Sequence, residues 1–394
     1  MSWTGALCEV RRMRFEEVYF RFGRGHLSCA EAADILGMSE RSFLRYRMRY
    51  EAEGAEGLCD RRVGRVSGRR IAADVATRVI ELYATRYFDF NVKHFHEKLV
   101  SEHGYRLSYG WTKRVLQDAG QVKRAKKRGA HRRKRPRKPL AGMMLHQDGS
   151  SHHWVPDAAW DLIVTMDDAT SEIYSAFFVE EEGTMSTFQG LGEVISRQGL
   201  FGALYADRGS HYWITKTADQ GVDEETPTQV KRALDQLGIT LIPASAPEAR
   251  GRSERMFGTL QGRLPQELRA AAITTMAAAN QYLSEVFLPA HNAAFRVPPA
   301  EVGSAFIPYI GRDLSDILCL QEDRIVGRDN CVSYRRLSLQ IPPDRHRHHY
   351  IKAKVRVHEY PDGRLAVFHG PRCLARYHSD ARLIDETGNA KTAA

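Results

Sequence analysis

The chain lacks the features that would tie it to a membrane or to secretion. It contains no run of about 18 apolar residues, so no membrane-spanning helix is expected. Its first residues, MSWTGALCEVRRMRFEE, lack the apolar core of a secretion signal. Its six cysteines include no CxxC pair. This spacing argues against a structural zinc site and a disulfide framework, and it predicts free thiols in a reducing cytoplasm.

Acidic residues are missing from one short segment. Residues 121–138 hold 11 Lys and Arg and no Asp or Glu, whereas residues 1–120 hold 21 against 16 and residues 139–394 hold 26 against 32. The net charge of +10 is therefore concentrated in the first third of the chain. Because Lys and Arg neutralise phosphates, this part is predicted to bind nucleic acid. The basic segment, residues 123–138, is interpreted as a phosphate-binding linker, with a merely solvated linker as the alternative.

Residues 28–50 are typical of two helices joined by a tight turn. Ser28 and Glu31 form a capping box, Gly37 ends the first helix and Ser39 begins the second. This pattern predicts a helix-turn-helix whose second helix enters the major groove, and the alternative is a small helical hairpin with a solvated basic face. The candidate DNA contacts recur every fourth residue on the second helix: Arg41, Arg45 and Arg49. Phe43, Leu44 and Met48 are left to pack.

A second helical unit is predicted between residues 74 and 120. It contains three amphipathic stretches, of which the last begins after Ser108 and ends before Gly120. Lys113 and Arg114 face outward from this last helix and are candidate DNA contacts. Two such units in tandem indicate a DNA site longer than one unit covers.

Beyond residue 139 the pattern changes to that of a mixed α/β layer. Three strands, a helix, a strand, a helix, a strand and a final helix are predicted up to about residue 270. Residues 322–378 alternate in the manner of strands and contain a Pro-Asp-Gly turn, which predicts a hairpin-rich small barrel.

Three acids occupy positions in the α/β part where metal ligands belong. Asp148 stands on the first strand, Asp207 ends the fourth, and Glu254 opens the last helix on what is predicted to be its core-facing side. If the first and fourth strands are neighbours, the three carboxylates converge, and their repulsion calls for hard cations such as Mg²⁺ or Mn²⁺. The alternative for Glu254 is an acid that complements the helix dipole.

The motifs HQDGS, YADRGS and PEARGRSERMFGTLQGRLP, in this order, resemble those of the DDE transposases of bacterial insertion sequences. The resemblance covers about residues 140–300 and implies a retroviral-integrase-like catalytic core with an RNase H-like fold. Asp148, Asp207 and Glu254 match its three acidic positions. The expected fold is multidomain, with all-α helix-turn-helix units, then the α/β core, then a small β-barrel. The expected boundaries are 1–66 and 67–122 for the helical units, 123–139 for the linker, 140–305 for the core and 315–380 for the barrel.

The resemblance also implies a mechanism and partners. Two Mg²⁺ ions, or Mn²⁺ in their place, would serve hydrolysis of a phosphodiester at each element end and attack of the 3′-OH on target DNA. The partners would be the terminal inverted repeats and target DNA, with at least a homodimer on the DNA and with no membrane or nucleotide cofactor. Further candidate DNA contacts lie in the linker and in the last helix: Lys126, Lys127, Arg132, Arg133, Arg252 and Arg263.

Several residues depart from the pattern or compete with it. Many members carry a basic residue seven positions after the Glu, where this chain has Gln261. Asp167 and Asp168 are interpreted as fold-supporting acids, and Trp154 and Trp160 as core aromatics. His152, His153 and the HRHH run at 346–349 are interpreted as a wet loop and a DNA-facing patch instead of metal ligands. Two functional alternatives remain, namely a catalytically silent DNA-binding regulator and a metal-dependent endonuclease that cuts without joining.

Overall fold

The structure of the chain is a computed structural model that describes residues 3–59, 71–124, 135–156, 158–214, 227–244, 251–343 and 347–384, with side chains from residue 9. The chain divides into two compact units, Met1–Ala76 and Thr77–Ala394. Among the described helices, none is long and apolar enough to cross a membrane.

The first unit is a bundle of three helices followed by a 3₁₀ turn: α1 (Trp3–Gly23), α2 (Cys29–Leu36), α3 (Glu40–Glu53) and η1 (Gly54–Leu58). Ser28 and Glu31 form the predicted capping box at α2, and Gly37 ends it with φ 64°. The Ser39 hydroxyl accepts from the amide of Ser42 and caps α3. The two predicted helices and their capping residues are therefore confirmed.

Phe43 anchors α3 to the rest of this unit. It is fully buried against Phe15, Ala32 and Ala33, and its ring centroid lies 5.9 Å from that of Phe15. The prediction that Leu44 and Met48 also pack was wrong, because these side chains are 39% and 66% exposed. Successive helical residues point about 100° apart, so the partly buried tyrosines one and two turns after Phe43 take those places: Tyr46 and Tyr50.

Three helices form the second helical segment: α4 (Ala73–Thr85), α5 (Val92–Ser101) and α6 (Tyr109–Asp118). Asn91 and Ser108 cap α5 and α6. The buried aromatics Tyr83, Tyr87 and Phe95 pack with ring centroids 5.0 and 5.4 Å apart. The helices predicted between residues 74 and 120 are confirmed.

The α/β part is a five-stranded sheet of order β3-β2-β1-β4-β5, with β3, β2 and β1 antiparallel and β1, β4 and β5 parallel. The elements follow in the predicted sequence of strands and helices: β1 (Leu145–Val155), β2 (Ala158–Asp167), β3 (Ile173–Val179), α7 (Thr184–Gln198), β4 (Ala203–Ala206), α8 (Gln229–Leu237), β5 (Thr240–Pro243) and α9 (Gly251–Gln261). The first and fourth strands are neighbours, which is the condition for the acids to converge.

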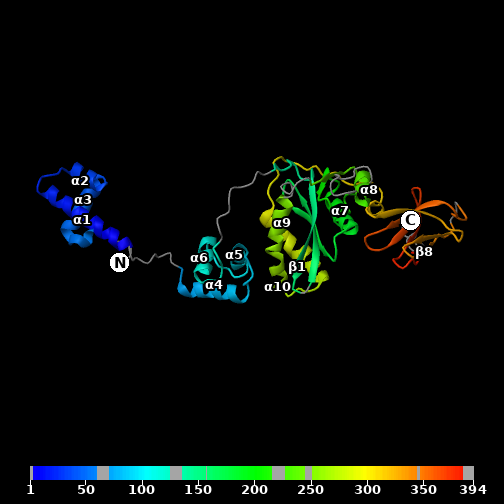
Figure 1. Ribbon diagram of the computed structural model, residues 1–394, viewed down its shortest axis with the longest axis horizontal. Coiled ribbons are helices and arrows are strands. Elements are labelled where there is room, and N and C mark those ends of the chain that lie inside the picture. Colours follow the sequence, from blue (N-terminus) through cyan, green and yellow to red (C-terminus); the bar gives the residue numbers. More distant parts are fainter. Residues whose placement is uncertain are drawn as a thin grey trace, which may run out of the picture. The chain divides into compact units, whose positions relative to one another are not determined.

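Helices cover both faces of this sheet (Figure 1). One apolar cluster joins Leu145 and Leu204 to α7 and α8. The other joins Trp154 and Trp160 to α9 and to the helices that follow it, and it confirms both tryptophans as core residues. Those helices are α10 (Leu264–Ala270), α11 (Met276–Tyr282), the π-helical turn η3 (Leu283–Phe287) and α12 (Leu288–Phe295).

A buried ion-pair cluster joins α5 to α10. Glu267 is 9% exposed, and its carboxylate lies 2.7 Å from Nε2 of His94 and 2.9 Å from Nζ of Lys98. It also accepts a hydrogen bond from the Tyr282 hydroxyl. These contacts fix α5 against the core.

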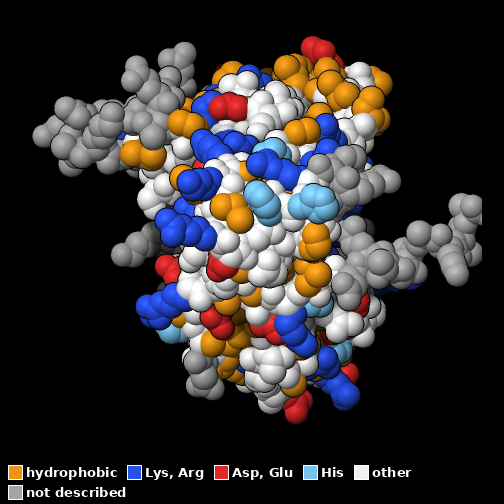
Figure 2. Space-filling view, turned by 90° about the vertical axis from the view of Figure 1, so that its right-hand side faces the viewer, with side chains coloured by type: hydrophobic (Ala, Val, Ile, Leu, Met, Phe, Trp, Pro, Cys, Tyr) orange, Lys and Arg blue, Asp and Glu red, His pale blue; other side chains and the backbone are white. Residues whose placement is uncertain are grey.

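The C-terminal segment contains an open four-stranded antiparallel sheet, β11-β10-β9-β6, and a separate two-stranded sheet. Its elements are η4 (Leu314–Asp316), β6 (Leu320–Ile325), β7 (Cys331–Tyr334), β8 (Leu337–Gln340), β9 (Lys354–Glu359), β10 (Leu365–His369) and β11 (Arg372–Tyr377). The Pro-Asp-Gly turn joins β9 to β10 in the predicted hairpin. The described strands form no closed barrel, so the predicted barrel is not confirmed. Figure 2 shows Lys, Arg and His side chains close together on the face that is turned toward the viewer.

Candidate functional site

The strand register brings Asp148 and Asp207 to the same level of the sheet. His146 on β1 pairs with Tyr205 on β4 in a parallel ladder. Each acid lies two residues beyond this pair, Asp148 within β1 and Asp207 directly after the last residue of β4. Neighbouring strands are about 4.8 Å apart. The two carboxylates are therefore neighbours because of backbone pairing.

Both acids line one small cavity at this end of the sheet. The Asp148 side chain is 9% exposed and that of Asp207 is half-buried. Asp207 Oδ1 accepts a hydrogen bond of 2.8 Å from the amide of Gly209, which fixes the turn after β4. The other lining residues are His146, Gln147, Tyr205, Ala206, Ala244 and Ser253.

Glu254 is not on the core-facing side of its helix, contrary to the prediction. Its side chain is exposed, while Ser253 is 3% exposed and lines the cavity. The apolar side of α9 contains Phe257 and Leu260, as expected. Because each residue turns the helix by about 100°, that side points Ser253 inward and Glu254 away from it. Glu254 therefore follows a residue that lines the cavity, but its own side chain is exposed and is not part of the cavity lining.

The structure thus brings together two of the three predicted ligands. Among the described residues, no three His, Cys, Asp or Glu side chains lie close enough to hold a metal ion. The donors that do meet, Asp148 and Asp207, are carboxylates, which suit Mg²⁺ and other hard cations. The described His152, His153, His348 and His349 likewise belong to no such group.

A buried tyrosine lies near the acidic pair. The Tyr212 hydroxyl donates to Oε1 of Gln147 over 3.1 Å, and Gln147 donates through Nε2 to Thr165. Burial raises the pKa of Tyr212 well above its ordinary value, and the nearby carboxylates Glu182, Asp207 and Asp148 raise it further. The hydroxyl therefore stays neutral and links β1 to the turn after β4.

Sequence reasoning missed Glu182 and His211 beside this cavity. A Cβ atom on Gly149 would lie 2.1 Å from Oε2 of Glu182, so the carboxylate covers the residue after Asp148. Nε2 of His211 lies 3.6 Å from Oε1 of Glu182. Burial lowers the pKa of His211, and the Asp207 carboxylate partly opposes this. The Gly in the motif HQDGS is the sequence signal for such a close approach.

Asp168 is buried among cations that come from distant segments. Its carboxylate accepts from Arg135, Arg252, His146 and the amide of Lys138. Burial raises the pKa of Asp168, but the hydrogen bonds from His146 and Lys138 and the charge of Arg252 lower it well below its ordinary value. Asp168 therefore stays charged.

Two candidate DNA contacts in and after α9 form ion pairs within the protein. The side chain of Arg252 is 16% exposed and bound to Asp168, and that of Arg263 is 12% exposed, pairs with Glu97 and lies over the Phe295 ring. Their burial corrects the expectation that they face DNA. Gln261, at the position of the usual basic residue, donates instead to Oγ of Ser150 over 3.0 Å.

The remaining candidate DNA contacts lie on helix surfaces or outside the described residues. Arg41, Arg45 and Arg114 are exposed, and Arg49 and Lys113 are partly buried. Four linker residues fall outside the described ranges: Lys126, Lys127, Arg132 and Arg133.

Comparisons with known proteins find relatives for most of the chain. A family described as "Winged helix-turn helix" matches residues 23–76. A protein of Sinorhizobium fredii named "Putative transposase y4bF" is 31% identical over 355 residues, which are 89% of this chain and 77% of that protein. The "Transposase for insertion sequence IS1202" of Streptococcus pneumoniae is 27% identical over 282 residues, which are 63% of this chain and 61% of that protein.

The solved structures that match the chain include an integrase domain and a chain of an intasome. The HTLV-2 integrase catalytic core domain in complex with magnesium, in its trimeric form, matches with 14% identity and a TM-score of 0.29 over 36% of this chain and 85% of that one. A chain of the simian T-cell lymphotropic virus intasome in complex with PP2A regulatory subunit B56 gamma matches with 13% identity and a TM-score of 0.33 over 78% of this chain and 99% of that one.

Proposed function

Because the chain belongs to the transposases of bacterial insertion sequences, we propose that it cleaves the ends of its element and joins them to target DNA. In the first reaction water attacks a phosphodiester and the 3′-oxygen leaves with a proton. In the second reaction that 3′-OH attacks a target phosphodiester, a new P–O bond forms, and the target 3′-oxygen leaves. The alignment of Asp148 and Asp207 over one cavity carries this proposal.

Asp148 and Asp207 would hold the divalent cations, and Glu254 would complete the ligand set from the first turn of α9. Two Mg²⁺ ions would supply positive charge at the attacking and leaving oxygens. The exposed carboxylate of Glu254 must then turn toward the cavity, which the adjacent Ser253 already lines. The hydrogen bond between Tyr212 and Gln147 would keep the two strands in register.

Recognition of the element ends would fall to the helical units. α3 presents Arg41 and Arg45 to solvent between well-defined caps, as a recognition helix requires. The basic segment would neutralise DNA phosphates next to the site that the helical units bind. A homodimer or larger assembly would hold two ends together.

The test is an incubation of the full chain with supercoiled plasmid and a labelled duplex that carries the terminal repeat of its own element. We expect cleaved and joined products with Mg²⁺ and none with EDTA. Asp148→Asn, Asp207→Asn and Glu254→Gln should each abolish both products and leave end binding within about twofold. The matched control is Glu285→Gln, an exposed acid away from the cavity, and it should be fully active.

Three results would change the assignment. Cleavage without joining would make the chain a nuclease, and tight binding with neither product would make it a regulator. If Glu254→Gln were active and Glu182→Gln inactive, the role of third metal ligand would be assigned to Glu182, which lies against Gly149.

A further inference from the structure

Asp168 is a buried acid that the proposed chemistry does not use. It follows β2 directly, its side chain is fully buried, and its amide donates to the carbonyl of Met144. A buried charge is tolerated only when it is paired and hydrogen-bonded. Its neighbour Asp167 is just as buried, but its described side-chain partners are all neutral: the amides of Gly142 and Thr170 and the Thr170 hydroxyl.

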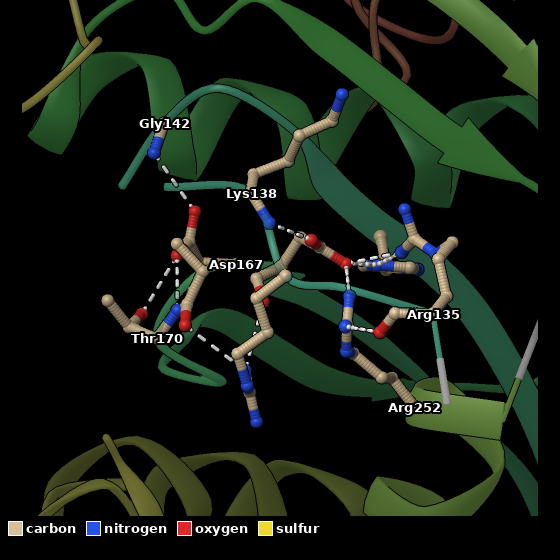
Figure 3. A network of polar contacts seen from close by, with 10 residues as sticks. Arg135, Lys138, Gly142, Asp167, Thr170 and Arg252 are labelled. Atoms are coloured by element: carbon tan, nitrogen blue, oxygen red, sulfur yellow. Dashed lines mark hydrogen bonds and ion pairs between the residues drawn. The ribbon is translucent and has the colours of Figure 1, made fainter. Parts of the chain in front are cut away.

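The partners of Asp168 come from three separate segments. Arg135 comes from the end of the basic segment, His146 from β1, and Arg252 from the first turn of α9. Figure 3 shows Arg135 and Arg252 converging on one carboxylate while the Lys138 amide approaches its other oxygen. Arg252 also donates to the carbonyl of Arg135 over 2.6 Å, so the two segments are joined directly. Arg137 adds a bond to the Asp168 carbonyl over 2.9 Å.

Each of these donors is next to the candidate site. His146 lines the cavity two residues before Asp148. Arg252 immediately precedes Ser253, which lines the cavity, and Glu254. The Arg135 guanidinium lies 5.6 Å from the centre of the Tyr205 ring, which lines the cavity as well. Arg135 and Arg252 pair with the Asp168 carboxylate, and Arg137 donates to the Asp168 backbone carbonyl, so a single residue binds cations from both segments beside the cavity.

We propose that Asp168 is a positioning residue for strand cleavage. Through Arg252 it fixes the first turn of α9, which carries Glu254, and through Arg135 it holds the end of the basic segment beside the cavity. The described end of the basic segment, from Arg135 to Lys138, is thereby connected to the first turn of α9 through one buried carboxylate. This inference rests on the proposed function.

The experiment measures cleavage of the labelled end duplex by the full chain with Mg²⁺ for Asp168→Asn, Arg252→Gln and the double variant. A displacement of reacting groups by about 1 Å can cost on the order of 100-fold in rate. We expect kcat to fall by about 10- to 100-fold in each single variant, with KM within about twofold. The double variant should be no slower than the slower single variant, because both changes break the same connection.

Asp167→Asn is the matched control, since it removes an equally buried neighbouring carboxylate that contacts no described cation. It should lower the thermal midpoint and leave kcat at saturating DNA unchanged. A normal kcat in folded Asp168→Asn, an equal loss in Asp167→Asn, or multiplied losses in the double variant would each overturn the inference.

Failure of a variant to fold and failure of the proposed function can both be distinguished from failure of this inference. If Asp168→Asn does not fold, Arg252→Gln and Arg135→Gln decide the matter: the first should lower kcat alone, the second should raise KM, and wild-type kinetics in both would overturn the inference. If the wild-type chain makes no metal-dependent product, the proposed function itself fails.

Discussion

Replacing Glu267 by glutamine should weaken the attachment of α5 to the core by a measurable amount. Glu267 is 9% exposed. Burial alone would raise its pKa, but hydrogen bonds from His94 and Lys98 and their charges lower it from 4.5 to about 2. A fall of this size corresponds to about 3 kcal/mol of folding stability, which the Glu267→Gln variant would lack because the glutamine side chain carries no charge.

The sign of the pH dependence follows from this lowered pKa. The carboxylate stabilises the fold fully above its unfolded-state pKa of 4.5 and loses the contribution as the pH falls toward about 2. About half of it should be gone near pH ~3.3. The free-energy difference between the wild-type chain and Glu267→Gln should therefore be constant near neutral pH and shrink in acid.

Urea unfolding measures this difference. Trp111 on α6 and the buried Trp154 and Trp160 report on the second helical segment and the core by fluorescence. Glu285→Gln, an exposed acid, is the control and should change stability by less than about 0.5 kcal/mol. A Glu267→Gln variant as stable as the control, or a difference that does not shrink below pH 4.5, would refute the reasoning.

Three other changes have defined expectations. Ser39→Ala removes the cap of α3 and should lower the free energy of unfolding of the first unit by about 1 kcal/mol, measured by thermal unfolding. An unchanged unfolding midpoint would contradict the role of this cap. Arg45→Ala should weaken end binding by about 1–3 kcal/mol in a competition assay if it reads a base edge, whereas equal weakening on shuffled DNA would assign it to phosphate. Gly199→Ala should cost about 2 kcal/mol or more, because φ is 105° and a Cβ would lie 2.4 Å from the Ile307 carbonyl oxygen; calorimetry with no loss of stability would argue against this geometry.

Local signals in the sequence predicted the elements well. The capping box at Ser28 and the turn at Gly37 involve residues at most four apart, so their energetics are visible in the sequence. The order of strands and helices from β1 to α9 followed from apolar patterning in the same way. The predicted barrel was not confirmed, because alternation indicates strands but does not specify whether a sheet closes.

The features of the site that the sequence could not predict depend on contacts between residues far apart in the chain. Arg263 was expected on DNA, but its partner Glu97 lies 166 residues earlier. Arg252 was likewise expected on DNA and is bound to Asp168, 84 residues away. The exposure of Glu254 depends on which of two neighbouring residues of α9 is buried, and in this structure it is the small Ser253.

The parallel pairing of β1 with β4 has a consequence for tolerance to insertion. The spacing of Asp148 and Asp207 is set by the pairs Leu145–Leu204 and His146–Tyr205, not by the chain that leads from Asp207 to α8. Residues added to that connection after the buried Tyr212 and Trp213 leave the pairs intact, since loop length costs little free energy. That later part of the connection is therefore a place where the chain can be lengthened, in evolution or by an inserted reporter peptide, without separating the two acids.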